Sequence, residues 1–138
     1  MQDSRLCLTA RQAFEWRDAH FMLRDLLLDL LALWPDTRMD VTCIGRTAAE
    51  EAAAGGRSGI HVAGPNWRAA DVRIRALPGN FQEKADGLAA DLNRVWQYDP
   101  ARPEKRVAVA ELHGSGPHIH LQVCPATRKR GPRDTLGA

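Results

Sequence analysis

Two histidines placed two residues apart, His118 and His120, open a segment in which polar and apolar side chains alternate. This alternation is typical of a β-strand, and we expect one over Ile119–Val123 that Pro125 ends. Because alternate residues of a strand point to the same side, both imidazoles should share one face of a sheet.

Three further segments have strand patterns. Val107–Leu112 precedes the histidine strand by a short loop, so the two strands should form an antiparallel hairpin. Met39–Ile44 and Asp71–Ala76 also alternate. In the segment Asp71–Ala76, Val72 and Ile74 should face the core, which places Asp71 on the polar face.

Three other segments have helical patterns. Thr9 and Gln12 form a capping box, and neither Gly nor Pro follows for a long stretch, which predicts one helix over about 10–34. A short helix is expected over 48–54 and another over about 80–96. The expected core face of the first helix comprises Phe14, Phe21, Leu27, Leu28, Leu31 and Trp34. The expected core face of the last comprises Phe81, Ala85, Leu88, Leu92 and either Val95 or Trp96.

The order of these elements indicates an α+β fold, with helices packed on one side of a small antiparallel sheet. A chain of 138 residues fits a single domain, 1–138. Its core should span about 39–124, and the basic tail over 125–138 is expected to be flexible, as chain ends often are.

The composition argues against several classes of protein. The formal net charge is only +2, and aromatic residues are not interleaved with the basic ones, so we expect no nucleic-acid partner. The apolar run Leu26–Trp34 contains Asp29 and is far shorter than the about 20 residues of a membrane helix, so no stable membrane insertion is expected. Cys7, Cys43 and Cys124 have no CxxC spacing, which favours reduced thiols over a disulfide framework. No signal peptide is recognisable, so the protein should be made in the cytoplasm.

One His and one Asp occur among small residues in the stretch SGIHVAGPNWRAAD, which begins at Ser58 and contains His61 and Asp71. The strand with His118 and His120 supplies two further imidazoles. Two imidazoles and a carboxylate from separate segments form the usual ligand set of a catalytic zinc, whose fourth position is left to water.

This stretch also resembles a known signature. Ser58, His61, Gly64 and the run from Arg68 to Asp71 are similar to the SxHxxGRAxD pattern of the zinc D-alanyl-D-alanine carboxypeptidases and phage endolysin peptidases. That family shares its fold with the hedgehog signalling domain. The resemblance implies a hedgehog/DD-peptidase-like fold.

Two shorter motifs extend the resemblance, which covers about residues 26–124 in element order. HisIleHis at 118–120 resembles the HxH strand of the same superfamily, and Arg46 matches the arginine of its SxYRS segment. The chain also departs from the pattern, because Pro65-Asn66-Trp67 forms an apparent insertion before Arg68.

The resemblance implies a role for each matching residue. His61, Asp71 and His120 would be zinc ligands. His118 would contact a zinc ligand or stabilise the transition state. Arg46 and Ser58 would bind substrate. The general base remains open between two residues: Glu111 lies nine residues before His120, and His113 is closer.

The implied function is hydrolysis of an amide bond in peptidoglycan stem peptides, by an enzyme of endolysin or carboxypeptidase type from a phage or prophage. Such an enzyme would act on the cell wall after release at lysis or from a virion. The alternative is a non-catalytic, metal-binding structural or virion module of the same fold. The sequence leaves the oligomeric state open.

Overall fold

The structure is a computed structural model of the chain, and it describes residues 5–7, 16–17, 19–33, 38–45, 67–73, 81–111 and 118–130. Two helices and seven strands lie in these ranges. In chain order they are β1 (Arg5–Cys7), α2 (Phe21–Leu33), β2 (Arg38–Cys43), β3 (Ala69–Arg73), α4 (Phe81–Val95), β4 (Trp96–Gln97), β5 (Ala108–Glu111), β6 (His118–Gln122) and β7 (Arg128–Lys129).

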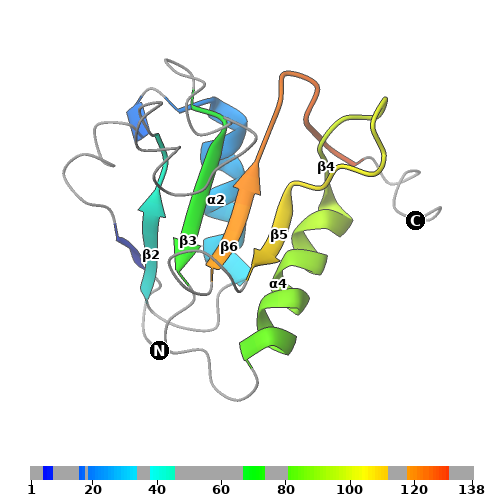
Figure 1. Cartoon of the computed structure of the whole chain (residues 1–138). Helices are drawn as coiled ribbons and strands as arrows, with labels where there is room; N and C mark the ends of the chain where they lie inside the picture. Colours follow the sequence, from blue (N-terminus) through cyan, green and yellow to red (C-terminus); the bar gives the residue numbers. More distant parts are fainter. Residues whose placement is uncertain are drawn as a thin grey trace.

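Five of the strands form one sheet in the order β1-β2-β3-β6-β5, which Figure 1 shows for its larger strands. All neighbours in it are antiparallel except β1 and β2, which pair in parallel. The expected α+β class and the antiparallel pairing of β5 with β6 are confirmed. The short strand β1 was not predicted, and it makes the sheet mixed at that edge.

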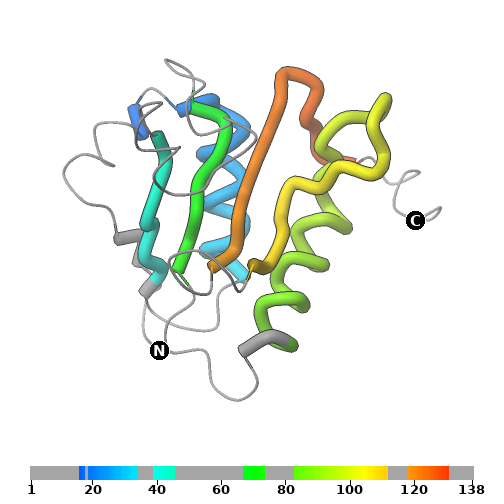
Figure 2. Tube along the Cα trace, in the orientation of Figure 1, coloured from blue at the N-terminus to red at the C-terminus, as the bar shows by residue number. Residues whose placement is uncertain are grey.

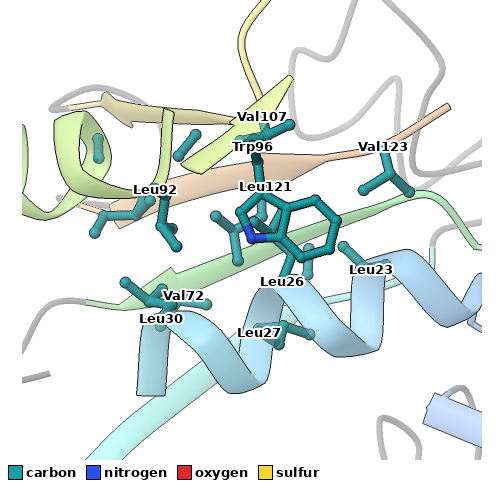
Figure 3. Packing of buried hydrophobic residues seen from close by; sticks show 14 of the residues in the cluster. Leu23, Leu26, Leu27, Leu30, Val72, Leu92, Trp96, Val107, Leu121 and Val123 are labelled. Carbon is teal, nitrogen blue, oxygen red and sulfur yellow. The ribbon is translucent and has the colours of Figure 1, made fainter. Parts of the chain in front are cut away.

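Both helices pack against the same face of this sheet. In Figure 1, α2 lies behind β3 and β6, while α4 runs beside β5. Figure 3 shows leucines of α2 pointing toward Val72 and Leu121 of the sheet, with the indole of Trp96 between the layers. Val72, Ile119 and Leu121 are fully buried there. Because side chains alternate along a strand, the intervening residues lie on the helix-free face.

The helix expected over about 10–34 is interrupted: Trp16 and Arg17 are helical, but Ala19 and His20 are not. Instead of a helix that runs through from residue 10, α2 begins at Phe21, because Ala19 forms a parallel bridge with Trp67. The backbone N–H of His20 donates to the carbonyl of Trp67 at 2.9 Å. His20 falls inside the helix expected over about 10–34, but it caps α2 instead: its Nδ1 accepts from the N–H of Met22 at 3.2 Å.

The buried face of α2 also differs from the prediction. Leu23, Leu26, Leu27 and Leu30 are fully buried at the i, i+3, i+4, i+7 spacing of a single helix face. Of the expected core residues, Phe21 and Leu28 are instead 56% and 50% exposed, and Leu31 is partly buried against the core. Leucines occur all round this helix, so the contact with the sheet selects which of them are buried.

The second helix follows the prediction closely. Ala85, Leu88 and Leu92 are buried, and Trp96, directly after the helix, completes this face. Val95, the alternative to Trp96, is 46% exposed. The side chain of Phe81 lies outside the described residues.

Part of the basic tail over 125–138, which we expected to be flexible, lies within the described residues. Residues 125–130 are described, and in them β7 pairs antiparallel with β4 at the end of α4. The backbone N–H of Arg130 donates to the carbonyl of Val95 at 2.7 Å. Figure 2 shows this segment returning toward the wide loop that joins α4 to β5. Residues 131–138 lie outside the described ranges.

Several other predictions concern residues that the structure does not describe. These are the short helix over 48–54, the start of the first helix with Phe14, Trp34 at its end, and residues 74–76 of the strand that begins with β3. Within the described ranges, no helix is both long enough and apolar enough to cross a membrane.

Candidate functional site

Two rows of side chains cross the helix-free face of the sheet at the level of the histidines. In one row Asp71 of β3 pairs with His120 of β6, which in turn pairs with Val109 of β5. In the next row, His118 lies between Arg73 of β3 and Glu111 of β5. The strand pairing therefore brings together two acidic and two imidazole side chains from segments far apart in the sequence.

Asp71 and His120 form the centre of this cluster. The Nδ1 atom of His120 lies 2.9 Å from Oδ1 of Asp71, which is hydrogen-bonding distance. Asp71 is only 7% exposed, and a carboxylate at such a site requires a positive or hydrogen-bonding partner. As predicted, Asp71 lies on the face of β3 away from the core, although it is more buried than a polar surface would suggest.

The second row links Glu111 to this pair through His118. Nε2 of His118 lies 3.0 Å from Oε2 of Glu111 and 3.9 Å from Oδ1 of Asp71. An ionised carboxylate only accepts hydrogen bonds, so Nε2 of His118 is the donor in its contact with Glu111. The side chain of Glu111 is 30% exposed, against 12% for that of His118, so Glu111 is the more accessible to water.

The local sequence explains how β3 can carry Asp71 at this position. Ala69 and Ala70, in the RAAD motif before Asp71, are both fully buried, so small side chains occupy both faces of the strand. On the other side, the register of β2 shifts between Val41 and Cys43, and this bulge places Cys43 opposite Asp71. The side chain of Cys43 is half-buried.

The predicted site residues divide into two groups. Asp71, Glu111, His118 and His120 are brought together by the β3-β6-β5 pairing, as described above. The other four, His61, Ser58, Arg46 and His113, lie outside the described residues.

One residue of this face was not predicted from the sequence. Gln122 follows His118 and His120 at the same two-residue interval, and its Oε1 lies 3.3 Å from Nε2 of His120. The signal was present in the alternation of the strand, which places every second residue on one face.

The donor chemistry of the cluster suits a zinc ion. Asp71 and His120 are two members of the predicted ligand set, and Oδ1 of Asp71 lies 2.9 Å from Nδ1 of His120. Carboxylate oxygen and imidazole nitrogen are usual ligands of zinc. Among the described side chains, no group of three or more His, Cys, Asp or Glu residues is already arranged to hold a metal. The third predicted ligand is His61, so the fit concerns two of the three ligands.

Comparisons of the chain with protein-family models, with curated proteins and with solved structures found no match.

Proposed function

We propose that the chain is a zinc-dependent peptidase that hydrolyses an amide bond in peptidoglycan stem peptides, of the endolysin or carboxypeptidase type. The observation that supports this most is the cluster on the helix-free face, where Asp71 contacts His120 at 2.9 Å and Glu111 contacts His118 at 3.0 Å. Residues from two separate sequence motifs meet there, as the resemblance to the zinc D-alanyl-D-alanine carboxypeptidases implies. The finer hedgehog/DD-peptidase-like fold belongs to the same proposal.

In this proposal Asp71 and His120, together with His61, hold the zinc ion. When bound, zinc acts as a Lewis acid and lowers the pKa of a coordinated water toward about 7. Glu111 takes the proton of the attacking water, because it is the most exposed of the four clustered side chains at 30%. The Nε2–H of His118 donates to Oε2 of Glu111 and so orients this carboxylate.

Binding of the substrate is assigned to residues outside the described ranges. Arg46 would bind a substrate carboxylate, since its planar guanidinium makes two parallel hydrogen bonds to such a group. Ser58 would contact the same substrate. A protein of this kind, from a phage or prophage, would reach the cell wall after release at lysis or from a virion.

The proposal is tested by measuring zinc content and muropeptide hydrolysis in the same preparations of tag-free protein. The parent should bind one zinc per chain and cleave muropeptides. Asp71→Ala and His120→Ala should each lose most of the zinc and all detectable hydrolysis. Asp86→Ala is the matched control, because Asp86 is an exposed acid on α4.

Each other outcome has a definite meaning. Hydrolysis that survives in both Asp71→Ala and His120→Ala would contradict the mechanism. A parent that holds zinc but cleaves no wall substrate would favour the alternative, a non-catalytic metal-binding virion module. A parent without zinc, even after zinc is supplied, would exclude both.

A further inference from the structure

The basic residues 128–130 belong to a segment that hydrogen bonds hold against the rest of the chain. Thr127, directly before them, is 1% exposed, and its Oγ1 donates to the carbonyl of Tyr98 at 2.8 Å. At the other end of the segment, the backbone N–H of Arg130 donates to the carbonyl of Val95 at 2.7 Å. The three basic side chains are therefore carried by an anchored segment.

The connection between β4 and β5 is also held by hydrogen bonds, although every residue from 100 to 106 is exposed. The backbone N–H groups of Arg102 and Lys105 each close a turn at 3.0 Å. The carbonyl of Arg106 accepts from Nε2 of Gln122 at 2.8 Å. Because β7 pairs with β4, where the connection begins, the two segments form one exposed part of the surface (Figure 2).

The positive charge of the chain is concentrated in these two segments, residues 98–106 and 128–130, which we call the basic surface. Of the 19 basic and 17 acidic residues of the chain, six basic and two acidic ones lie in it, which leaves 13 basic and 15 acidic elsewhere. One further acid, Asp29, lies beside it, with Oδ2 at 3.3 Å from Nζ of Lys129. Such an asymmetry of charge attracts anions to the basic surface.

Not all of this charge is neutralised within the protein. Arg102 pairs with Asp99 at 2.9 Å, so its charge is partly compensated. Lys105 and Arg106, by contrast, are exposed and form no ion pair with any other residue that the structure describes. Their charges can therefore interact with an anion from outside the chain.

The aromatic side chains at the basic surface indicate which kind of anion fits it. Trp96 and Tyr98 are only 3% and 7% exposed. Proteins that bind single-stranded nucleic acids stack the bases on accessible aromatic rings, and a surface without such rings contacts phosphates alone. An anionic polymer without bases matches this surface better than a nucleic acid does.

The basic surface also borders the candidate site. The Gln122 side chain donates to the carbonyl of Arg106, and its Oε1 lies 3.3 Å from Nε2 of His120. One side chain thus reaches both the basic surface and the cluster. A polymer bound to the basic surface would raise the effective concentration of any substrate that is attached to the same wall.

We propose that the basic surface binds a phosphate-bearing polymer of the cell wall, of the poly(polyol phosphate) class, and so retains the protein next to its peptide substrate. The inference rests on the proposed function for the location of this partner, whereas the binding itself requires neither zinc nor hydrolysis. Because contacts with successive phosphates release counterions, the affinity should fall as the salt concentration rises.

Binding is measured with labelled poly(glycerol phosphate), by fluorescence anisotropy at several salt concentrations. The surface variant combines Lys105→Gln with Arg106→Gln and removes two exposed charges. The matched control combines Arg17→Gln with Lys84→Gln, which removes two exposed charges outside the basic surface. The parent and both variants are also assayed for hydrolysis of soluble muropeptides and of walls that carry the polymer.

We expect the surface variant to bind poly(glycerol phosphate) about tenfold more weakly than the parent. The slope of log affinity against log salt concentration should be smaller by about 1–2. The control should behave like the parent. Soluble muropeptides should be hydrolysed equally by all three proteins, because neither Lys105 nor Arg106 belongs to the cluster, while the surface variant should hydrolyse polymer-bearing walls more slowly.

A second double variant, Arg128→Gln with Lys129→Gln, tests the other segment of the basic surface and should weaken polymer binding by a similar factor. Parent-like binding in both surface variants would overturn the inference. Equal weakening in the control would overturn it too, since only net charge would then matter.

The same assay includes two other anions as competitors. Single-stranded DNA with the same number of phosphates should bind more weakly than the polymer, and so should vesicles that contain phosphatidylglycerol. Tighter binding to DNA would overturn the inference in favour of a nucleic-acid partner. Tighter binding to the vesicles would overturn it in favour of a membrane surface.

The inference and the proposed function can fail separately. A parent that hydrolyses muropeptides but does not bind poly(glycerol phosphate), even at low salt, would overturn the inference alone. A parent that binds the polymer through the basic surface but cleaves no wall substrate would overturn the peptidase and leave the polymer-binding surface supported.

Discussion

Glu111 and His118 lie opposite each other on neighbouring strands, and their side chains meet at 3.0 Å between Oε2 and Nε2. The contact joins the most exposed acid of the cluster to an imidazole whose side chain is 12% exposed. An acid held in this way keeps a fixed orientation while remaining accessible to water. In the proposed mechanism, this orientation suits Glu111 to the role of general base.

Replacing this acid should separate metal binding from chemistry. In Glu111→Gln the side chain keeps its size but no longer takes up a proton, so muropeptide hydrolysis should fall by about 10²-fold or more. Zinc content should remain that of the parent, because Glu111 is not among the proposed ligands. Hydrolysis and zinc content are measured on the same samples.

The matched control is Glu104→Gln, at an exposed acid in the connection between α4 and β5. It should leave both quantities unchanged. If Glu111→Gln hydrolyses muropeptides at the parent rate, Glu111 is not the base, and His113 becomes the residue to substitute.

A second prediction concerns the contact between α2 and β4, the short strand that follows α4. Nε1 of Trp96 donates to Oδ2 of Asp29 at 2.7 Å, and Nζ of Lys129 lies 3.3 Å from the same oxygen. Trp96 is 3% exposed, so its buried N–H loses its acceptor when Asp29 is replaced by alanine. Asp29→Ala should therefore lower the free energy of unfolding by about 1–3 kcal/mol in urea denaturation.

Two control variants show which partner of Asp29 matters. Asp29→Asn keeps an acceptor for Trp96 and should recover much of the loss. Lys129→Ala removes an ion pair whose lysine side chain is 57% exposed and a cation–π contact in which Nζ lies 5.3 Å from the centre of the Trp96 ring, and at so exposed a lysine each should contribute less than about 1 kcal/mol. A loss in Lys129→Ala equal to that in Asp29→Ala would show that the ion pair, rather than the Trp96 hydrogen bond, provides the stability.

The sequence predicted the features of the fold that depend on local periodicity. Alternation identified β5 and β6, and helical spacing identified the buried face of α4. The start of α2 could not be found in this way, because it depends on the bridge between Ala19 and Trp67, whose positions are far apart in the chain. The pairing of β7 with β4 was missed because strands of two residues carry almost no periodic signal.

The candidate site was predictable to a similar extent. The two-residue spacing placed His118 and His120 on one face, and the motif singled out Asp71. That Asp71 lies opposite His120, and Glu111 opposite His118, depends on the register of three strands. Register is set by packing and by turns between strands, so the sequence pattern alone does not supply it.

A third prediction concerns the edge of the sheet at β5. The side chain of Asn93 on α4 donates to the carbonyl of Ala108 at 2.9 Å and accepts from its N–H at 3.1 Å. These two bonds satisfy the N–H and C=O of Ala108 on the side of the edge strand β5 that faces α4. Asn93→Leu should therefore reduce the free energy of unfolding by about 1–3 kcal/mol, measured by urea denaturation.

The neighbouring substitution Arg94→Ala is the control, because the Arg94 side chain is 66% exposed and its ion pair with Asp91 lies on the surface of the helix. It should change the free energy of unfolding by less than about 1 kcal/mol. Equal losses in Asn93→Leu and Arg94→Ala would contradict a specific role for the Asn93 hydrogen bonds.

The last prediction concerns the pH dependence of stability through His20 at the start of α2. Burial, and then the positive charge of Arg68, lower the pKa of His20 from its ordinary value of 6.5. Between the folded-state pKa and 6.5, the unfolded chain thus binds more protons than the folded chain. The contribution of His20 to stability is complete above the unfolded pKa and is lost as the pH falls through the folded pKa.

His20→Asn tests this contribution, because asparagine keeps an acceptor for the N–H of Met22 but does not titrate. Urea denaturation from about pH 7.5 to about pH 5 should show a steeper loss of stability in the parent than in the variant. The comparison between the two proteins cancels the titration of the other histidines. Parallel curves would mean that His20 binds protons equally in the folded and unfolded chains, and that its cap of α2 is insensitive to pH.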